Sequence, residues 1–63
     1  MTSFKGMKNA IENAFPGVYG IKKFANRNKL SFVHDSLSLV DIQKYFPQAT
    51  QSEEFIFHLT WEV

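Results

Sequence analysis

Three consecutive residues, His34, Asp35 and Ser36, are the residue types of a hydrolase triad. In such a triad the histidine acts as base, the carboxylate orients it and the hydroxyl attacks the substrate. Neighbouring residues on a strand point to opposite faces, so consecutive residues do not line up in these three roles. The pattern instead favours a turn that leads into a helix cap, and we expect the chain not to be an enzyme.

The two histidines, His34 and His58, are also candidates for metal binding. Further ligands would have to come from acidic residues at no recognisable spacing: Asp35, Asp41, Glu53 or Glu54. The chain has no cysteine, and its three glycines are isolated rather than gathered in a phosphate-binding loop. A domain this small has little interior for a pocket. We therefore expect no metal, no cofactor and no small-molecule substrate.

The length of 63 residues allows one domain with a modest core. A composition of 44% hydrophobic and 16% aromatic residues is typical of a folded chain. We find neither an apolar leader, which would indicate secretion, nor an apolar run of about 18 residues, which would indicate membrane insertion. With the lack of cysteine, these features lead us to expect a cytoplasmic protein.

The elements that must position any site follow from hydrophobic periodicity. A helix is predicted over about 3–15, with Thr2 or Ser3 as its cap, Pro16 after its end and a single apolar stripe: Phe4, Met7, Ile11 and Phe15. Two strands, about 18–24 and 30–34, follow around a polar turn at 26–29. A second helix is predicted over about 38–46, capped by Ser36 or Ser38 with Asp41 in the capping-box position.

Both helices end in the pattern Ile, three residues, Phe, Pro, at 11–16 and 42–47. Two matches of three positions are weak evidence of a duplication. We interpret them first as the same physical way of ending a helix. The last segment, about 54–62, alternates as a half-buried strand does, and its inward set is Phe55, Phe57, Leu59 and Trp61.

These elements predict a small two-layer α+β domain of order αββαβ. A crossover through the second helix would bring the third strand beside the first, which gives a three-stranded antiparallel sheet in order 2-1-3. Both helices would lie on one face of this sheet. The order is similar to a ferredoxin-like split βαβ arrangement without its first strand, a similarity of topology that implies no function.

Charge is divided along the chain although the net charge is only +1. Residues 1–31 hold six of the seven cations, and residues 32–63 hold five of the six carboxylates. The hairpin 19–29 combines aromatic and basic residues as nucleic-acid platforms do: Tyr19, Lys22, Lys23, Phe24, Arg27 and Lys29. A pI of 8.1 lies below the value of about 9 typical of such domains, and the lysines could simply keep a hairpin soluble.

The uncovered face of the sheet is the other candidate surface. We expect it to carry Ile56, His58 and Val33, together with Tyr19 or Ile21. An apolar face with a free edge strand is a place where another chain docks or adds a strand. The main expectation is therefore a non-catalytic regulatory or adaptor module that binds another protein or itself, as a homodimer. A nucleic-acid-binding module that uses the basic hairpin is the alternative.

Overall fold

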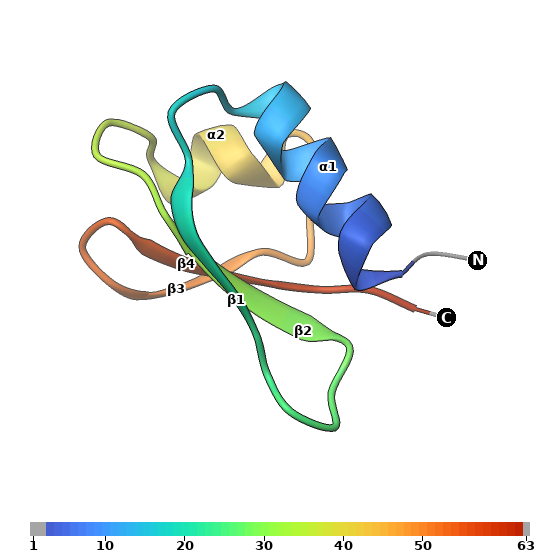
Figure 1. Ribbon diagram of the computed structural model, residues 1–63. Coiled ribbons are helices and arrows are strands. Elements are labelled where there is room, and N and C mark those ends of the chain that lie inside the picture. The colour runs from blue at the N-terminus through green and yellow to red at the C-terminus, as the bar shows by residue number, and fades with distance from the viewer. Residues whose placement is uncertain (1–2, 63) are drawn as a thin grey trace.

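The computed structural model describes residues 3–62, which form two helices packed on one face of an antiparallel sheet (Figure 1). The elements in chain order are α1 (Phe4–Ala14), β1 (Tyr19–Lys23), β2 (Lys29–Val33), α2 (Leu39–Gln43), β3 (Thr50–Glu53) and β4 (Ile56–Thr60). The predicted α+β class is confirmed. Within the described part of the chain, no helix is long and apolar enough to cross a membrane.

A serine side chain caps each helix at its N-terminal end. Ser3 caps α1, its Oγ accepting from the Gly6 N–H at 3.2 Å, and Thr2, the alternative cap, lies outside the described residues. Ser38 caps α2 in a capping box with Asp41. The Ser38 hydroxyl and N–H donate to Asp41 Oδ2 at 3.0 and 3.4 Å, and these hydrogen bonds lower the pKa of Asp41. The second helix was predicted over 38–46 but is shorter. Regular helix ends at Gln43, well before Pro47.

The sheet differs from prediction, having four strands in the order β1-β2-β4-β3. The segment Thr50–Glu53 forms an additional edge strand that the polar sequence TQSE did not reveal. The last strand, β4, pairs antiparallel with β2, so the predicted order 2-1-3 is wrong. The reason is that β3 follows the crossover through α2, and β4 then turns back beside it into the space next to β2.

The turn between β3 and β4 also corrects the predicted core. Phe55 was expected to point inward, but it is the second turn residue, 42% exposed, with a left-handed backbone φ of 73°. Bulky residues seldom adopt positive φ, and turns of this kind usually use Gly or Asn. The chain therefore reverses at Glu54 and Phe55 without a typical turn sequence.

The topology contains a split βαβ unit, since β2 and β3 run in the same direction with β4 between them. The first and last described segments are neighbours, the rings of Phe4 and Trp61 lying 6.4 Å apart between centroids. If these neighbouring ends were joined and the chain were read from β2 onward, its elements would follow in the order βαββαβ. This is the ferredoxin-like arrangement with the chain opened at a different connection.

The two halves of the chain repeat one plan. Each has a helix followed by a hairpin, α1-β1-β2 and α2-β3-β4, and the second strand of each hairpin lies in the middle of the sheet. Ile11 and Ile42, the first residues of the two Ile-Phe-Pro patterns, are both fully buried. The recurring sequence pattern thus occupies equivalent places in the fold.

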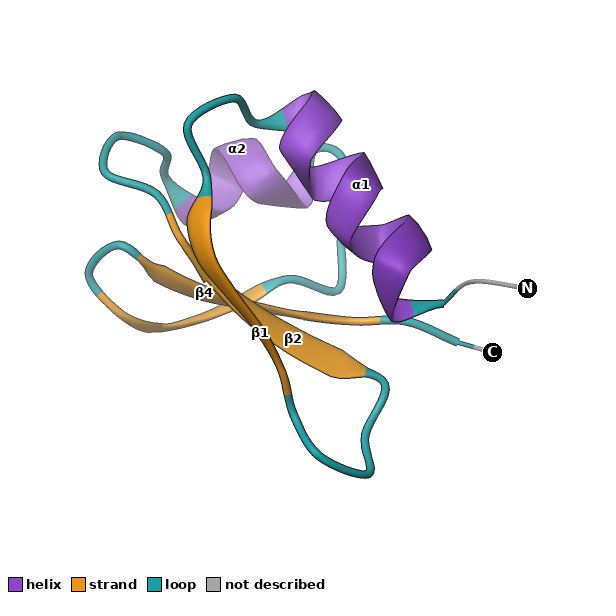
Figure 2. Ribbon diagram, in the orientation of Figure 1, coloured by secondary structure: helices purple, strands orange, loops and turns teal. Residues whose placement is uncertain are grey.

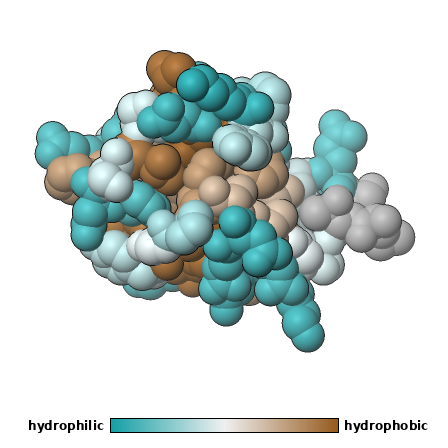
Figure 3. Space-filling view, turned by 90° about the horizontal axis from the view of Figure 1, so that it is seen from above, coloured by the Kyte–Doolittle hydropathy of each residue, from teal (hydrophilic) through white to brown (hydrophobic). Residues whose placement is uncertain are grey.

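The core lies between the helices and the covered face of the sheet (Figure 2). On the sheet side it consists of four side chains with no exposed area: Leu30, Phe32, Phe57 and Leu59. The helices contribute Met7, Ile11 and Ile42. Three residues outside the helices and strands complete the cluster: Phe15 just after α1, Ala49 just before β3 and Trp61 just after β4. The helix layer is thin, and Figure 3 shows apolar atoms between the hydrophilic side chains when the molecule is viewed from that side.

Packing of the short helix α2 is open to a direct test. Ile42→Val should lower the free energy of unfolding by about 0.5 to 1.5 kcal/mol, because Ile42 is fully buried and the change leaves a small cavity. Val40→Ala, on the same helix but 66% exposed, is the control and should change it by less than about 0.5 kcal/mol. Urea denaturation followed by the fluorescence of the single tryptophan, Trp61, measures both. Equal effects at the two positions would contradict the orientation of α2.

Candidate functional site

His34, Asp35 and Ser36 do not assemble into a triad. The Nδ1 atom of His34 accepts from the Ser36 N–H at 3.1 Å, and its Nε2 donates to the carbonyl of Pro16 at 2.9 Å. The carboxylate of Asp35 is held by the Tyr19 hydroxyl instead of orienting the imidazole. His34 is therefore a buried connector between the loop after α1 and the turn after β2.

The two histidines lie on opposite faces of the sheet. His58 is directly opposite Ser31 on the uncovered face, whereas His34 follows β2 with the alternation of the buried residues Leu30 and Phe32. Among residues 3–62, no three His, Asp or Glu side chains gather as a metal site would require.

The uncovered face is organised in rows across the sheet, because residues directly opposite each other share a face. One row is Tyr19, Val33, Ile56 and Glu53, and the next is Lys22, Ser31, His58 and Thr50. Phe24, Lys29 and Thr60 follow, Phe24 donating its N–H to the Lys29 carbonyl at 2.9 Å. The face thus has an apolar end and a basic, aromatic end.

Tyr19, Val33 and Ile56 form an apolar row on the uncovered face, and this row depends on a bulge in β1. One extra residue lies between Tyr19 and Lys22, where Gly20 adopts a φ of 64°. A Cβ atom on Gly20 would come within 3.3 Å of the Val33 side chain, so a glycine suits this position. Tyr19 is 51% exposed opposite Val33, and its hydroxyl donates to Asp35 Oδ1 at 2.8 Å. This hydrogen bond, together with burial and the charge of Asp35, raises the pKa of Tyr19.

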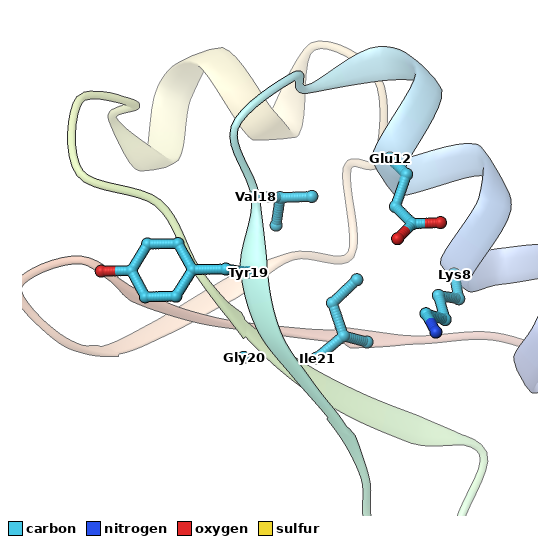
Figure 4. Close-up of a pocket in the computed structure, with 6 residues that line it drawn as sticks. All are labelled: Lys8, Glu12, Val18, Tyr19, Gly20 and Ile21. Atoms are coloured by element: carbon cyan, nitrogen blue, oxygen red, sulfur yellow. The ribbon is translucent and has the colours of Figure 1, made fainter.

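Ile21, the predicted alternative to Tyr19, belongs to the other side of β1. It is half-buried against the core beneath the helices. Beside it a shallow hollow of about 230 Å³ separates β1 from α1, with Lys8 and Glu12 on the helix side and Val18 and Ile21 on the strand side (Figure 4). Tyr19 is therefore the β1 residue of the uncovered apolar row.

Phe55 adds an exposed ring that the sequence prediction had placed in the core. It directly precedes Ile56, and its carbonyl accepts from the His34 N–H at 3.0 Å, which fixes the turn at the apolar end of the sheet. Strained backbone often occurs at binding sites, where the surrounding structure maintains it. No local turn signal in the sequence could have identified this position.

At the opposite end of the face, Phe24 lies between two other side chains. Lys29 Nζ is 4.9 Å from its ring centroid, a cation–π contact, and the ring of His58, which lies on β4 beyond β2, is 5.5 Å away. Phe24 and Lys29 are therefore in contact, and Lys22 shares their face.

The remaining predicted cations are dispersed. Lys23 is opposite the buried Leu30, which gives it the other face of β1, and Arg27 is exposed in the connecting turn. Tyr19 is at the far end of β1 from Phe24. The structure thus brings together Lys22, Phe24 and Lys29, places Arg27 next to them, and separates Lys23 and Tyr19 from them.

His58 has a perturbed pKa on the uncovered face. Burial lowers its pKa, and the charge of Lys29 lowers it further. Its Nδ1 is buried without a hydrogen-bond partner among the described residues, which fits a neutral ring.

Because the folded protein binds this proton more weakly than the unfolded chain does, stability should fall as the pH drops below about 6.5. His58→Phe keeps a ring against Phe24 but does not titrate, so the decline between pH 7 and 5 should become shallower. Thermal unfolding of both proteins across this range measures the difference. Parallel pH profiles would show that His58 titrates normally in the folded state.

Comparison with protein-family models, with curated proteins and with solved structures finds no match. The uncovered sheet face, with one apolar end and one basic end, is therefore the basis for a functional assignment.

Proposed function

We propose that this chain is a non-catalytic regulatory or adaptor module that binds another protein through its uncovered sheet face. The observation that carries the proposal is the apolar row formed by Tyr19, Val33 and Ile56 on a face that no other described segment covers. Apolar side chains gathered on an open face favour a protein contact, because their burial is the main gain on association.

The turn residue Phe55 supports the same end of the face. Phe55 exposes 42% of its surface, and its positive φ costs about 1 to 2 kcal/mol of backbone strain. Aromatic side chains are enriched at the centres of protein interfaces, so a docked partner gives this ring a role. A cytoplasmic location is part of the proposal, on the strength of the cysteine-free sequence.

The proposal is tested by two substitutions, of which one should stabilise the fold while it weakens binding. Phe55→Gly should raise the free energy of unfolding by relieving the strain, yet it should speed dissociation from the partner by removing the ring. Ile56→Asp should also speed dissociation, because it places a charge in an apolar contact. The partner is recovered from source cells with tagged protein, and its dissociation is measured by interferometry.

Thr60→Asp adds the same charge at the other end of the face and is the control for Ile56→Asp. A complex that is indifferent to both Phe55→Gly and Ile56→Asp would remove this face from consideration. A gain in binding with Phe55→Gly would show that the ring obstructs the contact.

The second candidate function is nucleic-acid binding at the basic end of the same face. It is favoured by the grouping of Lys22 and Lys29 around Phe24, with Arg27 in the adjacent turn. Against it, the Phe24 ring is already in contact with Lys29 and His58, which leaves less of it free to stack on a base.

Salt dependence distinguishes this candidate. If the three cations of the basic end contact phosphates, the log-log slope of binding to a mixed single strand against salt should be about −2. Lys22→Ala should reduce the magnitude of the slope by about 0.7, whereas Lys23→Ala, on the other face of β1, should leave it unchanged. Fluorescence anisotropy at several salt concentrations provides the measurement. Absence of binding at low salt would eliminate the nucleic-acid candidate.

A further inference from the structure

The imidazole of His58 places a polar atom inside the basic end of the uncovered face, where nothing satisfies it. Its Nδ1 is shielded from solvent and has no hydrogen-bond partner among residues 3–62. The ring as a whole is only half-buried, and it lies beside the half-buried ring of Phe24, with 5.5 Å between the centroids. In a neutral imidazole Nδ1 can be the unprotonated nitrogen, so that only a lone pair lacks a partner.

Protonation changes what this nitrogen requires. Both nitrogens of a charged imidazole are donors, so Nδ1 would carry an N–H with no acceptor and no water. A buried charged donor without a partner is costlier than a neutral polar atom without one. His58 can therefore gain a proton only if water reaches Nδ1, and for this a neighbouring side chain has to move.

The charged groups around His58 do not supply an acceptor. Lys22 on β1 shares its row, Lys29 on β2 lies in the next row, and Arg27 is exposed in the turn that joins these strands. The one carboxylate that the registers place on this face, Glu53 of β3, lies in the apolar row and does not bond to Nδ1. Burial lowers the pKa of His58, and the charge of Lys29 lowers it further.

Phe24 is the neighbour of His58 that is free to move. It lies just after β1 and outside the core cluster, and its ring contacts are with His58 and with Lys29, whose Nζ is 4.9 Å from its centroid. Its backbone N–H donates to the Lys29 carbonyl at 2.9 Å, so rotation of the side chain leaves the hairpin paired. Movement of the ring thus opens His58 to water without disturbing the core.

A second cation beside the same ring is not favoured. The face of an aromatic ring attracts a cation, and Lys29 already occupies this contact with Phe24. A charged His58 on the same ring would be repelled by Lys29. Protonation therefore weakens the group of three side chains, Lys29, Phe24 and His58, as a whole.

We propose that His58 is a proton sensor that controls the Phe24 ring: neutral His58 keeps the ring in place, and protonated His58 releases it. Because the closed form binds the proton more weakly than the open form, acid shifts the population toward the open form. The open form presents a free ring with an additional cation beside Lys22 and Lys29. This is the combination to which single-stranded nucleic acids bind. The switch belongs to the chain alone and does not depend on either proposed function.

Nuclear magnetic resonance of the unliganded chain tests the switch. The Cε1 proton of His58 reports its protonation, and the nuclear Overhauser contact between the rings of Phe24 and His58 reports closure. This contact should be lost along the titration curve of His58, between roughly pH 7.5 and 5, while the core contact between Phe32 and Phe57 remains. A ring contact that persists when His58 is fully protonated overturns the proposal.

The coupling must also act in reverse. Phe24→Ala exposes Nδ1 to water, so the pKa of His58 should rise toward its ordinary value of 6.5. Tyr45→Ala is the matched control, because it removes an exposed ring that contacts Phe15 on the covered side of the sheet, and it should leave the pKa of His58 unchanged. If Phe24→Ala has no more effect on this pKa than Tyr45→Ala, the ring does not control access to Nδ1 and the proposal is wrong.

Discussion

The centre of the sheet is a pair of strands whose inward side chains are completely buried. Leu30 and Phe32 on β2 lie opposite Leu59 and Phe57 on β4, and none of the four has exposed area. The rest of the structure depends on covering this small apolar layer. Residues 3–62 contain two helices that do so, of 11 and 5 residues, and both lie on this face. Nothing in the described chain is left to cover the second face.

Several local features make this arrangement possible. His34 joins the loop after α1 to the turn after β2 through both ring nitrogens, and Phe4 contacts Trp61 where the described ends meet. The strained turn at Phe55 lets β4 return beside β2 within two residues. A small domain thereby obtains a closed core on one side at the cost of an exposed ring and an open face on the other. The open face is the surface on which we base a binding role.

Sequence reasoning located part of the candidate site. Val33, Ile56 and His58 were expected on the uncovered face, together with Tyr19 or Ile21. Val33, Ile56 and His58 lie there, because alternation along a strand decides the face directly. Ile21 could not be separated from Tyr19 in this way, since the bulge at Gly20 shifts the alternation within β1. Phe55 was assigned to the core by the same alternation. The alternation of apolar and polar residues includes Phe55, but the backbone at Phe55 forms a turn and not a strand.

By itself, the sequence determined the existence of the two helices, the first hairpin and the last strand, and the two residues that β4 buries, Phe57 and Leu59. These follow from the periodicity and capping of neighbouring residues, which act over a few positions of the chain. Only the tertiary structure decided the strand order and the existence of β3. An edge strand exposed along its whole length needs no apolar alternation, so Thr50–Glu53 carries no pattern of its own. Its hydrogen bonds to β4 define it as a strand, and its place at the edge is what allows β4 to lie against β2.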